Sequence, residues 1–217
     1  MFNENEKFII LDTETANSLD DPIMYDLGYA IIDRYGKVYE QKSFIIAETF
    51  FDHALMTSAY YADKMQQYIA EINAGAHTLA MLKDVKDAVY KAMTRYNVRY
   101  AIAHNARFDY RSTNTTQRYM TSSKYRYFFK YGTQFLDTLK MAREVFGKDT
   151  AYKAYCKENG FVCKNGAPRY TAEVLYRYIS GNQDFNEAHT ALADVMIEKE
   201  IFAECVKRNP EVDGLLW

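Results

Sequence analysis

The spacing of the apolar residues changes once along the chain, and this change limits the fold more than any other feature. In the first 46 residues the apolar residues form short runs at Phe8–Leu11, Tyr25–Asp33 and Val38–Ile46. Such runs predict strands, and Tyr35-Gly36 predicts a tight turn that joins the last two as a hairpin. From residue 56 onward the apolar residues recur every three or four positions, which is typical of helices. An antiparallel start is therefore followed by a mainly helical region.

Six helices and two more strands are predicted in that second region. The helices span about 56–72, 82–96, 139–146, 171–179 and 190–206, and one more begins near Asn105, a candidate N-cap. The strands are Arg99–Ala103 and Gln134–Leu136. Helices between strands favour parallel crossover connections. We therefore expect an α/β fold with a mixed five-stranded sheet, antiparallel in its first three strands and then parallel, flanked by helices.

Composition narrows the class of protein. With 217 residues, 48% hydrophobic and 26% charged, the chain has enough apolar residues for the core of one domain, 1–217, and is unlike disordered proteins. No apolar run approaches 18 residues and the start is polar, so we expect neither a membrane span nor a signal peptide. Three scattered cysteines favour thiols in the cytoplasm. At a net charge of −2, nucleic-acid binding would need a local basic surface or a metal.

Two carboxylates stand at the end of the first predicted strand. Asp12 and Glu14 are two residues apart, so their side chains point to the same face of that strand. A divalent cation would relieve their repulsion, and oxygen ligands suit Mg²⁺ or Mn²⁺. For this pair alone, a solvated strand end is the simpler explanation.

Three further candidates lie where predicted helices begin. Asp109 falls in a first helical turn, where the helix dipole favours a carboxylate, although a purely structural role explains it about as well. His189 and Asp194 flank the start of the last helix. Five helical residues leave two side chains about 140° apart. These two converge only if His189 precedes the helix.

Together these residues are more specific than any one of them. Strand ends and helix starts are where α/β sheets form their clefts. The four carboxylates supply ligands for two cations, one of which lowers the pKa of an attacking water while the other neutralises the leaving oxygen. The imidazole of His189, with an ordinary pKa of about 6.5, can accept the water's proton near neutral pH.

Three motifs resemble those of the DnaQ-like, DEDDh group of exonucleases. In matching order and spacing they are Asp12-x-Glu14-Thr15, His104-Asn105-Ala106-x-Phe108-Asp109 and His189-x-Ala191-x-x-Asp194, and they span about residues 7–206. Asp137-Thr138-Leu139 is also similar to the group's segment after its fifth strand. The histidine ahead of the last aspartate marks the histidine branch. The chain departs from the group at Ala16–Leu19 and in the polar residues after Asp109, so we expect the helix there to be short or differently packed.

The resemblance implies a ribonuclease-H-like sheet, two Mg²⁺ or Mn²⁺ ions, and 3′→5′ hydrolysis of single-stranded DNA or RNA to 5′-mononucleotides. It makes Asp12, Glu14, Asp109 and Asp194 the metal ligands and His189 the general base. Residues implied to line or support the pocket for the terminal nucleotide are Thr13, Thr15, Asn105 and Phe108.

A basic and aromatic segment, expected as an insertion at about 110–131, follows Asp109. Six lysines and arginines between residues 107 and 131 are interleaved with aromatic residues, and Asp109 is the one acid among them. Basic side chains bind phosphates and rings stack on unpaired bases. Arg118 and Lys124 are therefore candidate substrate contacts. The alternative is a solvated loop whose rings face the core.

Three other functions were weighed. An oligoribonuclease-like enzyme for very short oligonucleotides would need a closed pocket and dimerisation, and a proofreading-type subunit would act with a polymerase. An inactive binding module gains no support, because all five catalytic positions are filled. A homodimer and a replication or repair partner are both compatible with the sequence, which does not distinguish DNA from RNA.

Overall fold

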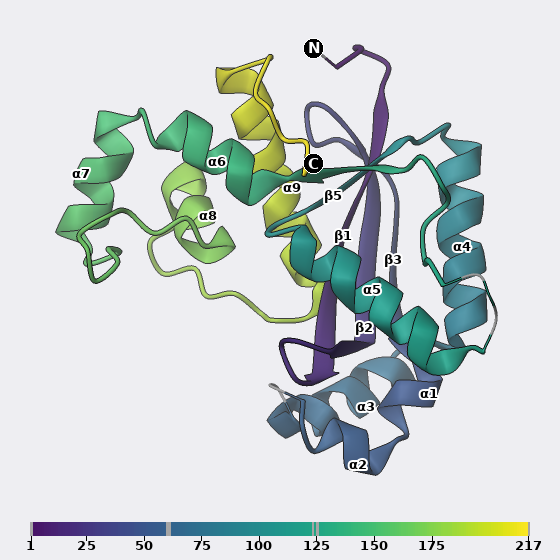
Figure 1. The fold of residues 1–217 in the computed structure, drawn as a ribbon. Coiled ribbons are helices and arrows are strands. Elements are labelled where there is room, and N and C mark those ends of the chain that lie inside the picture. Colours follow the sequence, from purple (N-terminus) through teal and green to yellow (C-terminus); the bar gives the residue numbers. More distant parts are fainter. Residues whose placement is uncertain (1, 60–61, 123, 125, 217) are drawn as a thin grey trace.

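The computed structural model describes residues 2–59, 62–122, 124 and 126–216. These residues form one six-stranded sheet in the order β4-β3-β2-β1-β5-β6 (Figure 1). The strands are β1 (Lys7–Asn17), β2 (Pro22–Asp33), β3 (Val38–Ile46), β4 (Thr78–Ala80), β5 (Tyr100–Ala103) and β6 (Gln134–Asp137). The first three pair antiparallel and the others join in parallel, which confirms the expected mixed sheet. The three-residue β4 was not predicted and makes the sixth strand.

The helices follow the predicted order with three differences, the first being an additional short helix at Ala47–Phe50. They are α1 (Ala47–Phe50), α2 (His53–Met56), the 3₁₀ helix η1 (Ala62–Lys64), α3 (Met65–Asn73), α4 (Leu82–Arg95), α5 (Arg107–Met120), α6 (Thr138–Phe146), α7 (Thr150–Glu158), α8 (Ala172–Ser180) and α9 (Ala191–Arg208). The prediction of one continuous helix over 56–72 was wrong, because α2 ends at Met56 and the next described helix, η1, begins at Ala62. Tyr60, which belongs to the predicted helix, lies outside the described residues. Helix α7 was not predicted. The Asp149 side chain begins it by accepting the backbone N–H groups of Ala151 and Tyr152.

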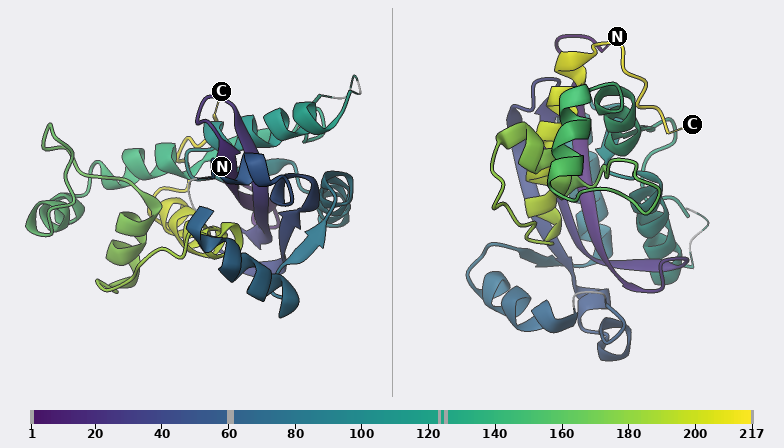
Figure 2. Two further views of the ribbon diagram at one scale, coloured as in Figure 1. Left: turned by 90° about the horizontal axis from the view of Figure 1, so that it is seen from below. Right: turned by 90° about the vertical axis from the view of Figure 1, so that its left-hand side faces the viewer.

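Both faces of the sheet are covered, which explains why every residue of β2 is buried. Successive side chains of a strand point to opposite faces. On β1, Phe8 and Ile10 therefore pack with α6, α8 and α9, whereas Ile9 and Leu11 pack with α4 and the start of α5. Figure 2 shows these two layers from two further directions. The catalytic candidates Asp12 and Glu14 continue the first of these alternations.

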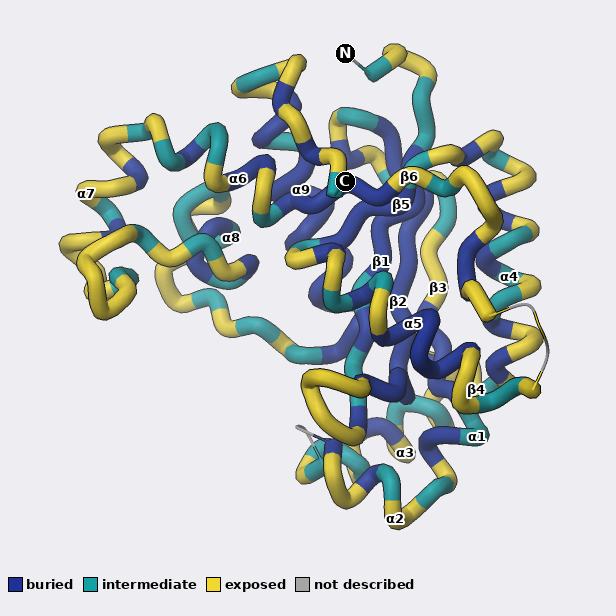
Figure 3. The backbone as a smooth tube through the Cα atoms, in the orientation of Figure 1, coloured by how far each residue is buried: buried dark blue, intermediate teal, exposed yellow. Residues whose placement is uncertain are grey.

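Helices α1 to α3 and η1 form a small separate layer beyond the ends of β1 and β2 (Figure 1). Their apolar residues pack against Ala16, Tyr25 and Ile45 in a third hydrophobic cluster. This layer, residues 47–77, is called the helical cap below. Figure 3 shows that its outer surface is exposed while the strands beneath it are buried.

Helix α5 was expected to be short or differently packed, and it is not short. It has 14 residues, and its polar residues Ser112 to Gln117 are buried against the sheet. Their hydroxyl and amide groups are bonded inside the protein: Thr116 Oγ1 accepts the Met24 N–H at 2.8 Å, and Asn114 Oδ1 accepts the Phe128 N–H at 2.9 Å. A polar helix can be buried when its polar groups find such partners.

The start of α5 also differs from prediction. Asn105 is not its N-cap; Ala106 takes that position and no side chain caps the helix. Asn105 instead adopts a left-handed backbone, φ 65°, and its N–H donates to Asp137 Oδ1 at 2.9 Å. Asparagine tolerates this conformation better than most residues. It therefore makes the turn from β5 into α5.

The expected insertion at 110–131 falls into two parts. Residues 110–120 belong to α5, which packs on β1 and β2. Beyond it, Phe128 and Phe129 are buried in the core, whereas Tyr127 and Tyr131 are exposed. Tyr125, counted among the aromatic residues of this segment, lies outside the described residues. Two of these rings therefore face the core, whereas two others lie at the surface.

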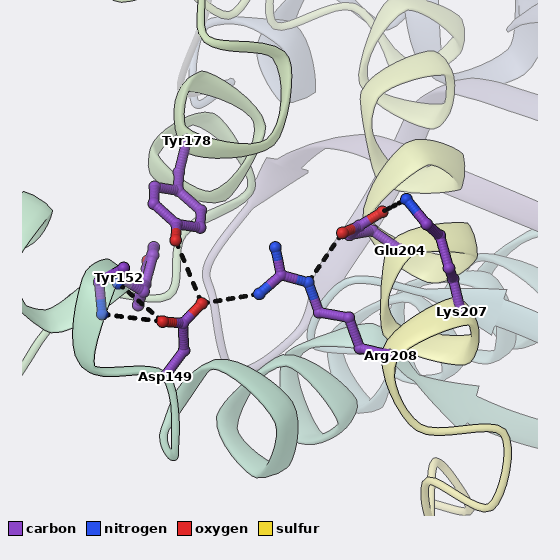
Figure 4. Close-up of polar contacts among 7 residues, drawn as sticks. Asp149, Tyr152, Tyr178, Glu204, Lys207 and Arg208 are labelled. Atoms are coloured by element: carbon purple, nitrogen blue, oxygen red, sulfur yellow. Dashed lines mark hydrogen bonds and ion pairs between the residues drawn. The ribbon is translucent and has the colours of Figure 1, made fainter.

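Two polar links close the outer parts of the fold. Asp149 joins three helices, because its carboxylate accepts the Tyr178 hydroxyl of α8 at 3.1 Å and pairs with Arg208 of α9 at 2.7 Å (Figure 4). At the other side, residues after α9 lie along β6, where the Asp137 N–H donates to the Gly214 carbonyl. No helix of the described residues is long and apolar enough to cross a membrane.

Candidate active site

Three of the predicted carboxylates meet at one point. Asp12 and Glu14 come from β1, and Asp194 from the first turn of α9. One ligand oxygen from each lies within 4.8 Å of the others. The expected convergence of these side chains is therefore a feature of the structure, and the group they form could hold a metal ion.

Gly28 allows α9 to approach the sheet at this point. It lies opposite Asp12 on the neighbouring strand β2. A Cβ atom at Gly28 would stand 2.3 Å from the Leu192 backbone nitrogen, a distance that no side chain tolerates. The absence of a side chain thus lets the backbone of α9 rest on β2 and brings Asp194 beside Asp12.

Asp109 reaches the site from the first turn of α5. Its carboxylate is buried and accepts the Thr13 hydroxyl at 3.0 Å, and that hydroxyl also lies 2.8 Å from Ser112 Oγ. Asp109 is not one of the three residues whose oxygens lie mutually within 4.8 Å. Its negative charge is nevertheless among those that raise the pKa of Asp12. Thr13, one of the residues implied to line or support the nucleotide pocket, is buried and donates to Asp109.

The site holds its carboxylates in an environment that disfavours their charge. Burial, followed by repulsion from Asp194, raises the pKa of Glu14 to about 9. Burial likewise raises the pKa of Asp194 to about 8 and that of Asp109 to about 7. For Asp12 the pKa lies well above its usual value, first through burial and then through neighbouring carboxylates. Nearby carboxylates with these shifts are what a divalent cation would stabilise in their charged form.

A fifth carboxylate was missed by the sequence analysis. Glu198 lies one turn after Asp194 on α9, is 3% exposed, and leaves Oε2 without a hydrogen-bond partner among the described residues. Among the charges that raise the pKa of Asp12, Glu198 comes first. Its position on the apolar side of α9, beside Val195 and Ile201, was the available signal, because buried glutamates are rare unless paired.

His189 lies immediately before α9, as its convergence with Asp194 requires. Its backbone is left-handed, with φ 51°, and its Nδ1 is 3.7 Å from Glu187 Oε2. The pKa of His189 is lowered by burial and then by the charge of Lys64. Burial raises the pKa of Glu187 to about 7. The ring is therefore biased toward the neutral form that a general base needs.

His104 belongs to the second motif but supports the site from behind. Its Nε2 lies 2.8 Å from the Tyr170 carbonyl and its Nδ1 lies 2.9 Å from Thr138 Oγ1. A carbonyl can only accept, so Nε2 carries the proton. Asp137 accepts the N–H groups of both Asn105 and Leu139. Together these bonds fix the turn that delivers Asp109.

The other predicted substrate residues are more scattered. Thr15 follows a register shift in β1 directly after Glu14 and is half-buried. Asn105 is exposed, and the half-buried ring of Phe108 lies 5.9 Å from the guanidinium of Arg111. In sequence, Thr15 and Phe108 directly adjoin the carboxylates Glu14 and Asp109, and Asn105 lies in the turn before α5.

Arg118 and Lys124 lie away from the acids. Arg118 follows Asp109 by nine residues, about 13 Å along a helix axis, and Lys124 comes after the end of α5. Both are exposed. Lys124 lines a cavity of about 740 Å³ between α4 and the end of α5, together with Lys83, Lys86, Lys130, Tyr90 and Tyr127. This cavity has the basic and aromatic character expected of the segment.

Comparisons with known proteins bear on the fold. No family model matches the chain, and a search of curated proteins found no match. Exonuclease I from Methylocaldum szegediense matches with a TM-score of 0.60 and 17% identity, over 95% of this chain and 42% of that one. E. coli exonuclease I in complex with a 5cy-dT13 oligonucleotide matches with a TM-score of 0.61 and 14% identity, over 95% and 41%.

The chain thus spans about two-fifths of the length of these exonucleases. At this level of identity the likeness concerns the arrangement of the backbone. The chain has the fold of exonuclease I over that length, which is the ribonuclease-H-like fold that its motifs imply.

Proposed function

We propose that the protein is a metal-dependent 3′→5′ exonuclease that releases 5′-mononucleotides from single-stranded DNA or RNA. The observation that carries this proposal is the convergence of Asp12, Glu14 and Asp194 within 4.8 Å, on the fold of exonuclease I. Asp109 and His189 complete the five catalytic positions from α5 and from the segment before α9.

The donor set fits divalent cations. Every candidate ligand is a carboxylate, the type of ligand that Mg²⁺ and Mn²⁺ prefer. Two such ions, held by Asp12, Glu14, Asp109 and Asp194, would lower the pKa of a water and neutralise the leaving oxygen. One structure of E. coli exonuclease I with single-stranded DNA is a zinc-bound form, which supports a metal at this site and leaves Mg²⁺ or Mn²⁺ as our choice on ligand chemistry.

The residues of the chain have distinct roles in the proposed reaction. His189 in its neutral form accepts the proton of the attacking water. Thr13 donates to Asp109 and so fixes the orientation of that carboxylate. Thr15, Asn105 and Phe108, which come from the motifs that supply the carboxylates, are proposed to hold the terminal nucleotide. Its phosphate is then attacked from the side of His189, and the shortened strand leaves with a 3′-hydroxyl.

A single strand is the proposed substrate because E. coli exonuclease I has been solved with dA16 and dT13 oligonucleotides. Arg118 and Lys124 lie toward the far end of α5 from Asp109, so we assign them to nucleotides several positions from the 3′ end. An oligoribonuclease-like enzyme for very short substrates and a proofreading-type subunit are the alternatives. The cytoplasmic location and the homodimer or replication partner stay predictions.

A digestion panel tests the proposal. Single- and double-stranded DNA, RNA and dinucleotides, each labelled at the 5′ end, are incubated with Mg²⁺ or Mn²⁺. We expect a ladder that shortens from the 3′ end, no reaction in EDTA, and loss of activity in Asp194→Asn with the fold intact. Asp184→Asn, an exposed aspartate ahead of the site, is the matched control. Full activity in excess EDTA or in Asp194→Asn would contradict the proposal.

A further inference from the structure

We propose that the helical cap positions the general base: Lys64 and Tyr68 hold residues 188–191 from two sides and thereby fix His189. This inference rests on the proposed function, since it assigns a role to residues outside the five catalytic positions. Lys64 ends η1 and Tyr68 lies in the first turn of α3. Four residues apart in a helical segment, they project from the same side of the cap.

Lys64 contacts the carbonyl groups of residues 188 and 189. Its ammonium group donates to the Ala188 carbonyl at 2.6 Å and lies 3.3 Å from the His189 carbonyl. The contact joins residues 124 and 125 positions apart in sequence. A hydrogen bond from a charged donor is about twice as strong as one between neutral groups. Lys64 therefore positions both peptide bonds of His189, the one before it and the one after it.

Tyr68 is linked to the start of α9 through Asp26. Its hydroxyl donates to Asp26 Oδ2 at 3.0 Å, and the same oxygen accepts the Ala191 N–H at 3.0 Å. Asp26 and Tyr68 are 0% and 1% exposed, so neither bond is exchanged for water. The Thr190 side chain makes no capping hydrogen bond to α9. Asp26, from β2, thus takes the place of a local cap and anchors the first residue of α9.

The backbone of His189, which lies between these two sets of hydrogen bonds, needs such support. His189 has φ 51° in a turn that leads directly into a helix. Left-handed conformations of residues other than glycine cost free energy and persist where the surroundings determine them. The carbonyl groups of residues 188 and 189 are fixed on one side and the N–H of residue 191 on the other. The backbone of His189 thus lies between fixed groups, which sets the direction in which its side chain leaves the chain.

Lys64 and Tyr68 both belong to the helical cap. Its cluster packs Tyr68 against Tyr25 with ring centroids 5.6 Å apart, and Tyr68 also lies 5.5 Å from the ring of His77. His77 in turn is held by Glu71 at 2.8 Å and by Ser43 at 2.5 Å. Tyr68 is thus fixed to the sheet from several directions. A rigid Tyr68 can transmit the position of the sheet to the start of α9.

A double-mutant cycle separates this role from direct contact with substrate. If Lys64 acts through His189, Lys64→Met lowers the single-turnover rate roughly ten- to a hundredfold, the usual worth of a charged hydrogen bond. Lys64→Met should then have little further effect in a His189→Ala background. Lys64→Arg, which keeps a charged donor, should recover part of the rate. Lys153→Met, at an exposed position on α7, is the matched control and should leave the rate unchanged.

Tyr68→Phe tests the link through Asp26 with minimal change in packing. It removes the hydroxyl that meets Asp26 and should lower the rate roughly three- to tenfold, again only while His189 is present. Equal losses with and without His189, for either variant, would overturn the proposal and indicate a direct contact with the strand or a general loss of structure.

Amide hydrogen exchange supplies a readout that does not need activity. We expect faster exchange at residues 187–191 in Lys64→Met and Tyr68→Phe, with the Ala191 amide most affected, and no change there in Lys153→Met. Unchanged exchange in both cap variants would overturn the proposal. If the wild-type protein degrades no nucleic acid, the proposed function fails, while the exchange data still decide whether the cap fixes this segment.

Discussion

Glu198 lies beside the candidate metal ligands, and its Oε2 has no hydrogen-bond partner among the described residues. This single residue shows how the site balances charge. Its burial and the charges of Asp109 and Asp194 raise its pKa well above the usual value. A hydrogen bond from the His104 backbone amide opposes the rise. When a folded-state pKa is raised in this way, the folded protein is most stable below the unfolded pKa and loses stability as the pH increases.

Glu198→Gln should therefore stabilise the metal-free protein at alkaline pH. We expect its melting temperature in EDTA to exceed that of the wild type by about 2–4 °C at pH 8, the shift for roughly 1 kcal/mol in a chain of this size. At pH 4.5 the difference should vanish, because the wild-type glutamate is then protonated. Scanning calorimetry of both proteins checks this, with the exposed Glu158→Gln as control. A destabilised Glu198→Gln at pH 8 would contradict the expected repulsion.

His189 sets the expected pH dependence of the reaction. Its pKa is lowered by burial and by Lys64, so the ring becomes charged, and inactive as a base, only below the ordinary imidazole value. Activity should fall as the pH decreases through that lowered pKa. His189→Ala should reduce the single-turnover rate roughly 10²–10⁴-fold and remove this acid limb. Rates measured from pH 5.5 to 9 decide the matter, and an unchanged limb in the variant would assign it to another group.

Residues with a chemical role were easier to predict than those that support them. Asp12 and Glu14 stand out because their spacing is a local feature. Their predicted place at a strand end was wrong, since β1 continues to Asn17 and both lie within the strand. Lys64 and Asp26 contact residues 188–191 only after the cap and α9 have packed on the sheet. Their signals lie in long-range contacts, which a single sequence without an alignment does not contain.

Among the elements, α5 departs furthest from its sequence pattern. Its residues 112–117 read as solvent-exposed, yet they are buried. The hydroxyl groups of Thr113 and Thr116 donate to the carbonyls of the preceding turn at 2.7 Å, so the side chains satisfy their own polar groups. Strands β1 and β2 were predicted well because alternation and continuous apolar runs are local properties. A buried polar helix has no comparable pattern.

Thr116→Val tests this view of α5. The change keeps the shape of the side chain but removes the oxygen that accepts the Met24 N–H at 2.8 Å. A buried donor left unsatisfied costs about 1–3 kcal/mol. We expect that loss in the free energy of unfolding by urea, with the activity per folded molecule retained. Thr150→Val, exposed at the start of α7, provides the control; a loss no larger than in this control would mean that the buried hydroxyl contributes little.

For the whole molecule, the raised pKa values of the buried carboxylates determine how stability depends on pH. Glu14, Asp194 and Asp109, with pKa values of about 9, 8 and 7, bind more protons in the folded state than in the unfolded state near neutral pH. The stability of the metal-free protein should therefore decline as the pH rises from about 5 to 9. A cation that binds only the folded state reverses this by mass action.

Mg²⁺ or Mn²⁺ should accordingly raise the melting temperature more at pH 8.5 than at pH 5. At low pH the carboxylates hold protons that compete with the cation. Thermal scans at several pH values, with each ion and with EDTA, measure the difference. A buffer that contains K⁺ in place of the divalent ion, at equal ionic strength, controls for general screening of charges by salt. An equal gain at both pH values would indicate ions bound elsewhere.

The overall architecture was predictable for a physical reason. The order of strands and helices, together with the rule that parallel strands need crossover connections, leaves few topologies. The broken helices of the cap and the added β4 were missed, because segments of three or four residues are held by packing more than by their own preference.

The residues that lie along β6 have a consequence for self-association. The Leu216 N–H donates to the Phe135 carbonyl, and Leu215 bridges to Leu136. They occupy hydrogen-bonding groups that an edge strand would otherwise offer to another chain, while the opposite edge, β4, is only three residues long. Removing the residues after Arg208 should uncover this edge and promote concentration-dependent aggregation, visible by light scattering. A truncated protein that stays monomeric would show that the edge is protected by other means.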